Sequence, residues 1–149
     1  WLLFLHADTV LDQAWADEAT TFMASAAERE CAAVFRFALD DVSRAARRLE
    51  RLVAWRCRLF GLPYGDQGLL IARRFYRDLG GFRPLPLMED VDLTRRIGRQ
   101  RLHYLRTAAL TSAERYRRSG YVVRSARNLV CLSLYLLRAP LGAVARLYG

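Results

Sequence analysis

The sequence opens with an unbroken apolar run, Trp1–Leu5, which ends at the turn-forming residues His6-Ala7-Asp8-Thr9. A continuous apolar run closed by such residues is typical of a strand buried on both faces of a sheet. Sheets of this kind occur in α/β proteins, in which helices cover both faces. The opening residues therefore predict a layered α/β domain with an acidic side chain at the carboxyl end of a core strand.

Helical and extended patterns alternate along the rest of the chain, which favours an α/β sheet with crossover helices. The 149 residues suffice for one domain, with an α/β part at 1–120 and terminal helices at 121–149. Strands are predicted at 31–39, 68–72, 102–105 and 109–111. Helices are predicted at 12–29, 43–59, 74–79, 89–98, 121–138 and 141–148.

The composition indicates a globular protein with an anionic partner. Hydrophobic residues make up 53% of the chain and charged residues 26%, which excludes intrinsic disorder. The formal net charge is +9, and all 24 basic residues are arginine, whose planar guanidinium suits phosphate and carboxylate. Nucleic acid, acidic lipid and a phosphorylated small molecule all fit this charge.

The cysteines and the apolar segments indicate a cytoplasmic protein. Cys31, Cys57 and Cys131 are odd in number and widely spaced, which argues against a disulfide framework or a structural zinc site and suits a reducing compartment. The sequence contains nothing that resembles a signal peptide. The apolar stretch 129–137 is about half the ~20 residues of a spanning helix, so we expect no membrane crossing.

Acidic residues gather in three short segments that could carry chemistry. Asp8 follows the first strand, and His6 would point to the same side of an extended chain. Asp66 lies between two glycines in GDQG, which allow close approach of a ligand to the backbone. Glu89, Asp90 and Asp92 open a predicted helix. Each segment also has a structural interpretation, as a turn, a connection or a helix cap.

Basic residues form three further groups. Arg115 and Arg117 belong to a basic segment that could close over a diphosphate, although a solvated surface is the simpler interpretation. Arginines at 44, 47, 48 and 51 share one helix face. The last two helices combine arginines with apolar residues, so they could lie on an acidic bilayer surface at the inner face of the membrane or pack on the core.

Three motifs, in this order, resemble glycosyltransferase family 2, whose members have the GT-A fold: LLFLHADT, YGDQGLLIARRFYRDLGGF and PLMEDVDLTRRI. They are similar, more narrowly, to a bacterial subgroup of radical-SAM/selenodomain-associated transferases, in which HADT, GDQG and MED recur. The final ARLYG also resembles this subgroup, so the likeness covers essentially the whole chain. The Q-x-x-R-W motif of processive members is missing, which argues against a polymerising synthase.

The resemblance implies a GT-A-like, mixed, mainly parallel sheet and inverting transfer of a sugar from a nucleotide-diphosphate donor to an acceptor hydroxyl. It implies that Asp8 holds a divalent cation, Mg²⁺ or Mn²⁺, and that His6 replaces the usual first acid of the D-x-D motif on the donor side. Asp90 matches the catalytic base, with Glu89 as its supporting neighbour. The remaining matches are Asp66 and Gln67 on the acceptor side and Arg115 and Arg117 as diphosphate contacts.

In this family a nucleotide-binding half precedes the D-x-D strand, so we expect the 149 residues to be a partial domain that lacks those strands. We expect the partial chain to expose an apolar sheet edge and to be weakly active or inactive alone. An arginine-rich binding module for nucleic acid or an acidic membrane surface is the alternative. Because the acids cluster in three loops, we do not expect nucleic acid as the partner. A nucleotidyltransferase would require a glycine-rich phosphate loop near the first strand.

Overall fold

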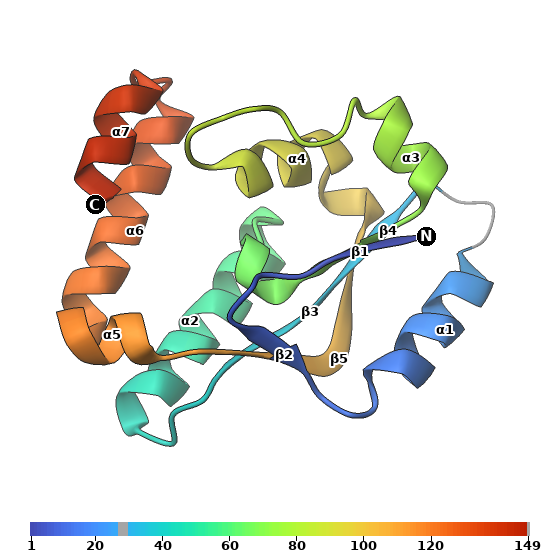
Figure 1. The fold of residues 1–149 in the computed structure, drawn as a ribbon, viewed down its shortest axis with the longest axis horizontal. Helices are drawn as coiled ribbons and strands as arrows, with labels where there is room; N and C mark the ends of the chain where they lie inside the picture. Colours follow the sequence, from blue (N-terminus) through green and yellow to red (C-terminus); the bar gives the residue numbers. More distant parts are fainter. Residues whose placement is uncertain (27–29, 149) are drawn as a thin grey trace.

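The computed structural model describes residues 1–26 and 30–148 and shows a mixed α/β fold (Figure 1). Its strands are β1 (Leu2–Phe4), β2 (Thr9–Leu11), β3 (Ala32–Leu39), β4 (Leu69–Ile71) and β5 (Leu102–Thr111). Its helices are α1 (Trp15–Ser25), α2 (Arg44–Phe60), α3 (Arg73–Asp78), α4 (Glu89–Ile97), α5 (Glu114–Ser119), α6 (Tyr121–Leu136) and α7 (Leu141–Tyr148). Two short 3₁₀ turns are η1 (Gly65–Gln67) and η2 (Arg99–Arg101).

The strands form one mixed five-stranded sheet in the order β1-β4-β3-β5-β2. Among the described strands only β3 and β5 pair in parallel, and the other three pairs are antiparallel. A mixed sheet is confirmed, but the expected predominance of parallel pairs is wrong. The reason is that an unbroken apolar run reports burial on two faces and does not report the direction of the neighbouring strand.

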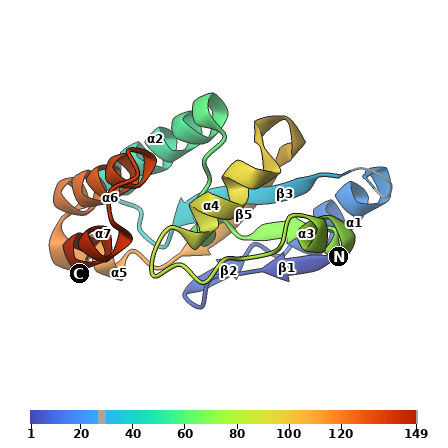
Figure 2. The ribbon, with the colours of Figure 1, turned by 90° about the horizontal axis from the view of Figure 1, so that it is seen from above.

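Helices cover both faces of the central strand, β3. Ala33 and Phe35 pack with α1, through a cluster that includes Phe22, whereas the alternating Ala32 and Val34 pack with α3 and α4. Because alternate side chains of a strand point to opposite faces, α1 lies on one side of the sheet and α3 and α4 lie on the other. In Figure 1, α3 and α4 lie toward the top of the view and α1 toward the lower right, with the strands between them, and Figure 2 shows the same elements from above.

The first strand is not the fully buried core strand that its sequence predicts. β1 lies at the edge of the sheet and pairs with β4 alone among the described strands, and its residues are half-buried. The edge position of β1 agrees with the expected sheet edge, although its apolar side chains are half-buried and its pairing is antiparallel. β2 was not predicted, because Thr9–Leu11 directly follows a turn and gives only three residues of pattern. The predicted strands 102–105 and 109–111 are instead one strand, β5, with an irregularity opposite β3.

Most helices match their predicted positions. Ser43 caps α2 through its side chain, Gly98 follows the last residue of α4, and Pro140 separates α6 from α7. α1 is described as far as Ser25, and its predicted end at Arg29 lies outside the described residues. The segment with Arg115 and Arg117 forms the short helix α5. Within residues 1–26 and 30–148, no helix is both long and apolar enough to span a membrane.

Candidate active site

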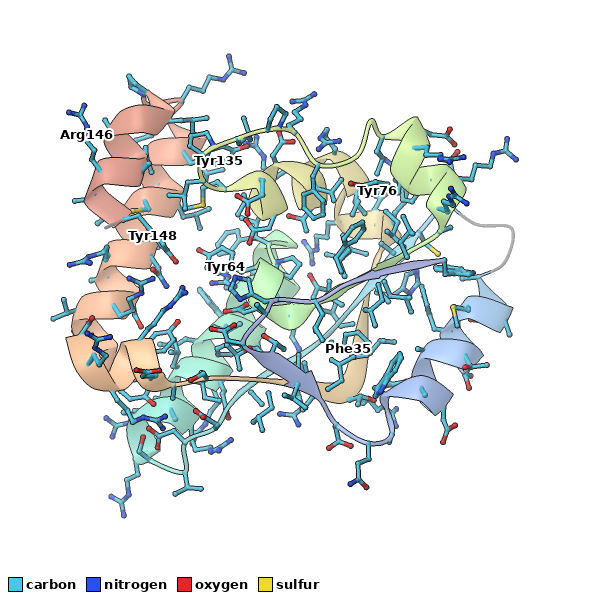
Figure 3. All side chains as sticks on the ribbon, viewed as in Figure 1. Phe35, Tyr64, Tyr76, Tyr135, Arg146 and Tyr148 are labelled. Atoms are coloured by element: carbon cyan, nitrogen blue, oxygen red, sulfur yellow. The ribbon has the colours of Figure 1, made fainter. Side chains whose placement is uncertain are left out.

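A cavity of about 250 Å³ opens where β1 ends, between η1, the start of α4 and the terminal helices. Asp8 and Asp90, which are far apart in the sequence, both line it. Tyr64, just before η1, and Tyr148, at the end of α7, border it from two sides (Figure 3). Of the predicted site residues, the cavity brings together His6, Asp8, Asp66, Glu89, Asp90 and Arg115.

His6 and Asp8 are held together by a tight turn after β1. The Thr9 N–H donates to the His6 carbonyl at 3.1 Å, and the His6 Nδ1 lies 2.6 Å from the Asp8 Oδ1. The two side chains therefore meet because the backbone turns, and the predicted extended conformation is wrong. This contact orients the Asp8 carboxylate at the cavity.

A chain of hydroxyl groups fixes this turn against η1. The Thr111 hydroxyl donates to the Asp66 carbonyl at 3.1 Å, so the Thr9 hydroxyl must be the donor in its 2.7 Å contact with Thr111. Both threonines are buried. The chain connects β2, β5 and η1, and it holds the segments that carry Asp8 and Asp66 in a fixed relation.

Asp90 sits in the first turn of α4 and accepts two backbone hydrogen bonds. The Gly65 N–H donates to its Oδ2 at 2.6 Å, and the Val91 N–H donates to its Oδ1 at 2.7 Å. Burial raises the pKa of Asp90, and the negative charge of Glu89 adds to this shift, while the two N–H donors oppose it. The result is a firmly placed carboxylate that binds a proton more readily than an ordinary aspartate.

Two other residues of the segment Met88-Glu89-Asp90-Val91-Asp92 have structural roles. Met88 is buried and adopts a left-handed conformation, with φ of 66°, directly before α4. Such a conformation is strained for a residue other than glycine, and it turns the chain so that Glu89 and Asp90 reach the cavity. Asp92 points away from it and pairs with Arg96 at 2.7 Å. Because Arg96 also donates to the Leu79 carbonyl at 2.5 Å, Asp92 is a structural residue.

Asp66 lines the cavity and has one carboxyl oxygen without a hydrogen-bond partner among the described residues. This oxygen, Oδ1, is sealed from solvent. Burial, together with the negative charge of Asp90, raises the pKa of Asp66 to about 6, although the positive charge of Arg56 opposes the shift. A carboxyl group with a raised pKa that lines a cavity is a candidate for a functional role.

The other polar residues of GDQG serve the fold. The Gln67 Nε2 donates to the Phe35 carbonyl at 3.1 Å, and its Oε1 accepts from the Cys57 thiol at 3.1 Å. Gln67 is buried and does not line the cavity, so its acceptor-side role stays a prediction. The two glycines of GDQG were expected to allow a ligand close to the backbone, but the neighbours of both are protein atoms. A Cβ on Gly65 would meet Asp90, and one on Gly68 would lie 3.2 Å from Phe35.

The opposite wall of the cavity is basic. Arg115 of α5 and Arg124 of α6 line it, and Arg124 is buried beside Tyr148, with its guanidinium carbon 4.5 Å from the ring centroid. Asn128, one turn further along α6, also lines the cavity with a buried Oδ1 that has no partner among the described residues. Arg117 does not line the cavity and instead pairs with Asp40 at 3.6 Å.

Arg124 and Asn128 are therefore site residues that sequence reasoning missed. The sequence leaves open whether the arginines of the last helices lie on a bilayer surface or pack on the core, and it gives no sign that α7 folds back beside α6. The signal in the sequence that could have found Arg124 is its position among the apolar residues of a terminal helix.

A second cavity of about 300 Å³ adjoins the first on the side of β1. It shares His6, Tyr64, Gly65, Glu89 and Asp90 with the first cavity. Its remaining wall is largely apolar: Phe4, Leu5, Val34, Pro63, Gly68, Leu69, Phe82 and Thr94. Asp90 thus lies between a cavity with several charged side chains in its wall and a largely apolar one.

Over the described parts of the chain, no three His, Cys, Asp or Glu side chains gather as a group that could hold a metal ion. Asp8 offers one carboxylate, which suits Mg²⁺ or Mn²⁺ when phosphate oxygens and water supply the other ligands. Comparisons with family models, with curated proteins and with solved structures found no match for this chain. A functional assignment must therefore rest on the site itself.

Proposed function

We propose that this chain forms the catalytic part of an inverting glycosyltransferase of GT-A type, which moves a sugar from a nucleotide-diphosphate donor to an acceptor hydroxyl. The observation that carries the proposal is the shared cavity of Asp8 and Asp90, with Arg115 and Arg124 on its opposite wall. Inverting transfer needs a base on one side of the reacting sugar and charge stabilisation for the leaving diphosphate on the other. The cavity offers both within one space.

The donor diphosphate would lie between Asp8 and the arginines. Arg115 and Arg124 carry permanent positive charges and planar donor groups that suit phosphate oxygens. Asp8, oriented by His6, would hold the divalent cation on the diphosphate. When bound, the cation supplies Lewis-acid stabilisation of the leaving group.

Asp90 would accept the proton of the attacking hydroxyl. Its two backbone donors fix the carboxylate, and its raised pKa makes it a better proton acceptor than a solvated aspartate. Glu89 is exposed at the cavity rim and acts on Asp90 through its charge. Asp66, which also lines the cavity and is half-buried as a whole, would receive a hydroxyl group of the acceptor.

The test compares two substitutions in the protein. Asp90→Asn keeps the shape of the site and removes the base, so we expect sugar transfer to fall by about 10²- to 10⁴-fold while nucleotide-diphosphate binding is retained. Asp8→Asn is expected to weaken Mn²⁺-dependent nucleotide binding, measured by calorimetry with and without the cation.

The matched control is Asp78→Asn, because Asp78 is an exposed acid on α3 outside the cavity. We expect both transfer and binding to be unchanged in this variant. Unchanged turnover in Asp90→Asn would remove Asp90 from its role. If no nucleotide diphosphate binds in the presence of Mg²⁺ or Mn²⁺, the proposal is refuted.

A further inference from the structure

The positive charge of the chain is concentrated in its helices at one end. α2 contains six arginines and one acid, and residues 114–148 contain seven arginines and one acid. The rest of the chain holds eleven arginines against thirteen acids, so the whole net charge of +9 arises from these helices. α2 and α6 are in contact and lie on the side of the molecule opposite α1 (Figures 1 and 2).

The outer side of α6 is apolar along its length. Its inward residues, Arg124, Cys131 and Leu132, are buried. Val122 is 82% exposed, and Leu137, just beyond the helix, is 79% exposed. Between them the exposed side chains are apolar or small: Val123, Ala126, Leu129, Val130, Ser133 and Leu136. We call these eight residues the α6 outer face.

The exposed side of α2 combines aromatic, aliphatic and basic residues. Trp55 and Phe60 are both exposed, and their rings pack edge to face with centroids 6.1 Å apart. Leu52 and Leu59 are exposed beside them. The same helix exposes Arg44, Arg48, Arg51 and Arg58. Its single acid, Glu50, is largely buried and already paired with Arg47 at 2.6 Å.

We propose that the α6 outer face and the exposed side of α2 bind the surface of an anionic lipid bilayer. Apolar and aromatic side chains would enter the interface between headgroups and acyl chains, and the arginines would contact lipid phosphates. This inference does not depend on the proposed function, because the residues that line the catalytic cavity lie on the inward side of α6.

Charge and polarity together favour a lipid surface over other partners. Nucleic acid would contact the arginines of α2 but would leave the apolar α6 outer face uncovered. A second copy of this chain would bring two strongly positive surfaces together, which costs free energy. An acidic bilayer satisfies both the apolar residues and the positive charge.

The experiment measures co-flotation of the protein with two kinds of vesicle, one of pure phosphatidylcholine and one that contains 30 mol% phosphatidylglycerol. We expect binding to the anionic vesicles and release at high salt, because exposed charges are screened. Val122→Ser/Leu137→Ser and Arg48→Glu/Arg51→Glu are each expected to weaken partitioning by about tenfold or more. Leu129→Ser serves as a milder second variant.

The matched controls place the same changes elsewhere. Val10→Ser changes an exposed residue of β2, and Arg73→Glu/Arg77→Glu reverses two exposed charges of α3. Both controls should float like the unaltered protein, and circular dichroism should show the same fold for all variants. Equal binding to neutral vesicles, or no binding at all, would overturn the proposal. So would an α6-dependent dimer that does not bind vesicles, or DNA binding that survives the Val122→Ser/Leu137→Ser change.

Discussion

At the scale of single residues, the cavity separates three carboxylates by their surroundings. Asp8 is partly exposed and contacts His6, Asp90 is held by two N–H donors, and Asp66 has a sealed oxygen without a partner. Burial raises the pKa of both Asp66 and Asp90, so these two carboxyl groups bind a proton more readily than ordinary aspartates. The sequence alone does not distinguish these three aspartates. The structure distinguishes them, because they differ in burial and in hydrogen-bond partners.

The raised pKa of Asp90 predicts the acid limb of the pH–rate profile. A general base works only when it is deprotonated, so transfer should be lost as the pH falls through the pKa of Asp90. Because that pKa is raised by burial, the limb should lie above the ~3.9 of an ordinary aspartate. The measurement is kcat/KM across pH, with circular dichroism at each pH to show that the protein stays folded. A limb at or below pH 4 would contradict this role.

Asp66 should make the folded protein less stable as its charge appears. Its pKa is about 6 in the folded protein against an ordinary 3.8, so between these values only the folded state keeps the proton. The free energy of unfolding should therefore fall as the pH rises from about 4 to about 6, by at most about 3 kcal/mol. Asp66→Asn removes this loss.

Urea unfolding at pH 4 and at pH 7.5 tests this prediction. Asp66→Asn should match the unaltered protein at the lower pH and exceed it in stability at the higher one. Asp78→Asn, which changes an exposed acid, should show no such difference. A stability gain that is equal at both pH values would show that the gain does not come from the charge of Asp66.

Among the secondary-structure elements, β5 is irregular opposite β3, and a side chain from α1 forms hydrogen bonds with its irregular part. The register between β3 and β5 shifts after Val34, and the residues that interrupt the pairing of β5 include Arg106 and Thr107. Glu18 of α1 accepts hydrogen bonds from the N–H groups of Arg106 and Thr107, at 2.7 and 2.8 Å, and from the Thr107 hydroxyl. One carboxylate thereby satisfies donors that the sheet leaves unpaired.

Glu18→Gln is expected to destabilise the fold by about 1–3 kcal/mol, because one amide oxygen must replace two carboxylate oxygens at these donors. Thermal or urea unfolding at neutral pH measures the change. Asp17→Asn is the matched control, since Asp17 is the exposed neighbour on the same helix. Equal effects of the two substitutions would show that Glu18 does not hold the irregular part of β5.

Four elements, α4, β5, β1 and α6, show which parts of the fold the sequence could predict and which it could not. Acids in the first turn of α4 and Gly98 after its end are local signals, and that helix matches its prediction. Arg106 and Thr107 interrupt the apolar pattern of β5, so the sequence predicts two strands where Glu18 maintains one. The antiparallel pairing of β1 and the inward side of α6 depend on distant partners, and local pattern does not encode them.

In the molecule as a whole, the two sides of helix α6 have different properties. The inward side of α6 contributes Arg124 and Asn128 to the cavity, whereas its outer face is apolar and uncovered by described residues. The order of the three acidic motifs in the sequence does not fix their distance in space. Their convergence on one cavity follows from the turn after β1, from η1 and from the start of α4.

The edge position of β1 has a consequence for how firmly the two halves of the cavity are held. Asp90 lies in the first turn of α4, whose inner residues Val91, Leu93 and Ile97 are fully buried. Asp8 follows a strand of three residues that pairs on one side only among the described strands. Local opening, and with it fast amide hydrogen exchange, should therefore concentrate at Leu2–Phe4, while the start of α4 remains protected.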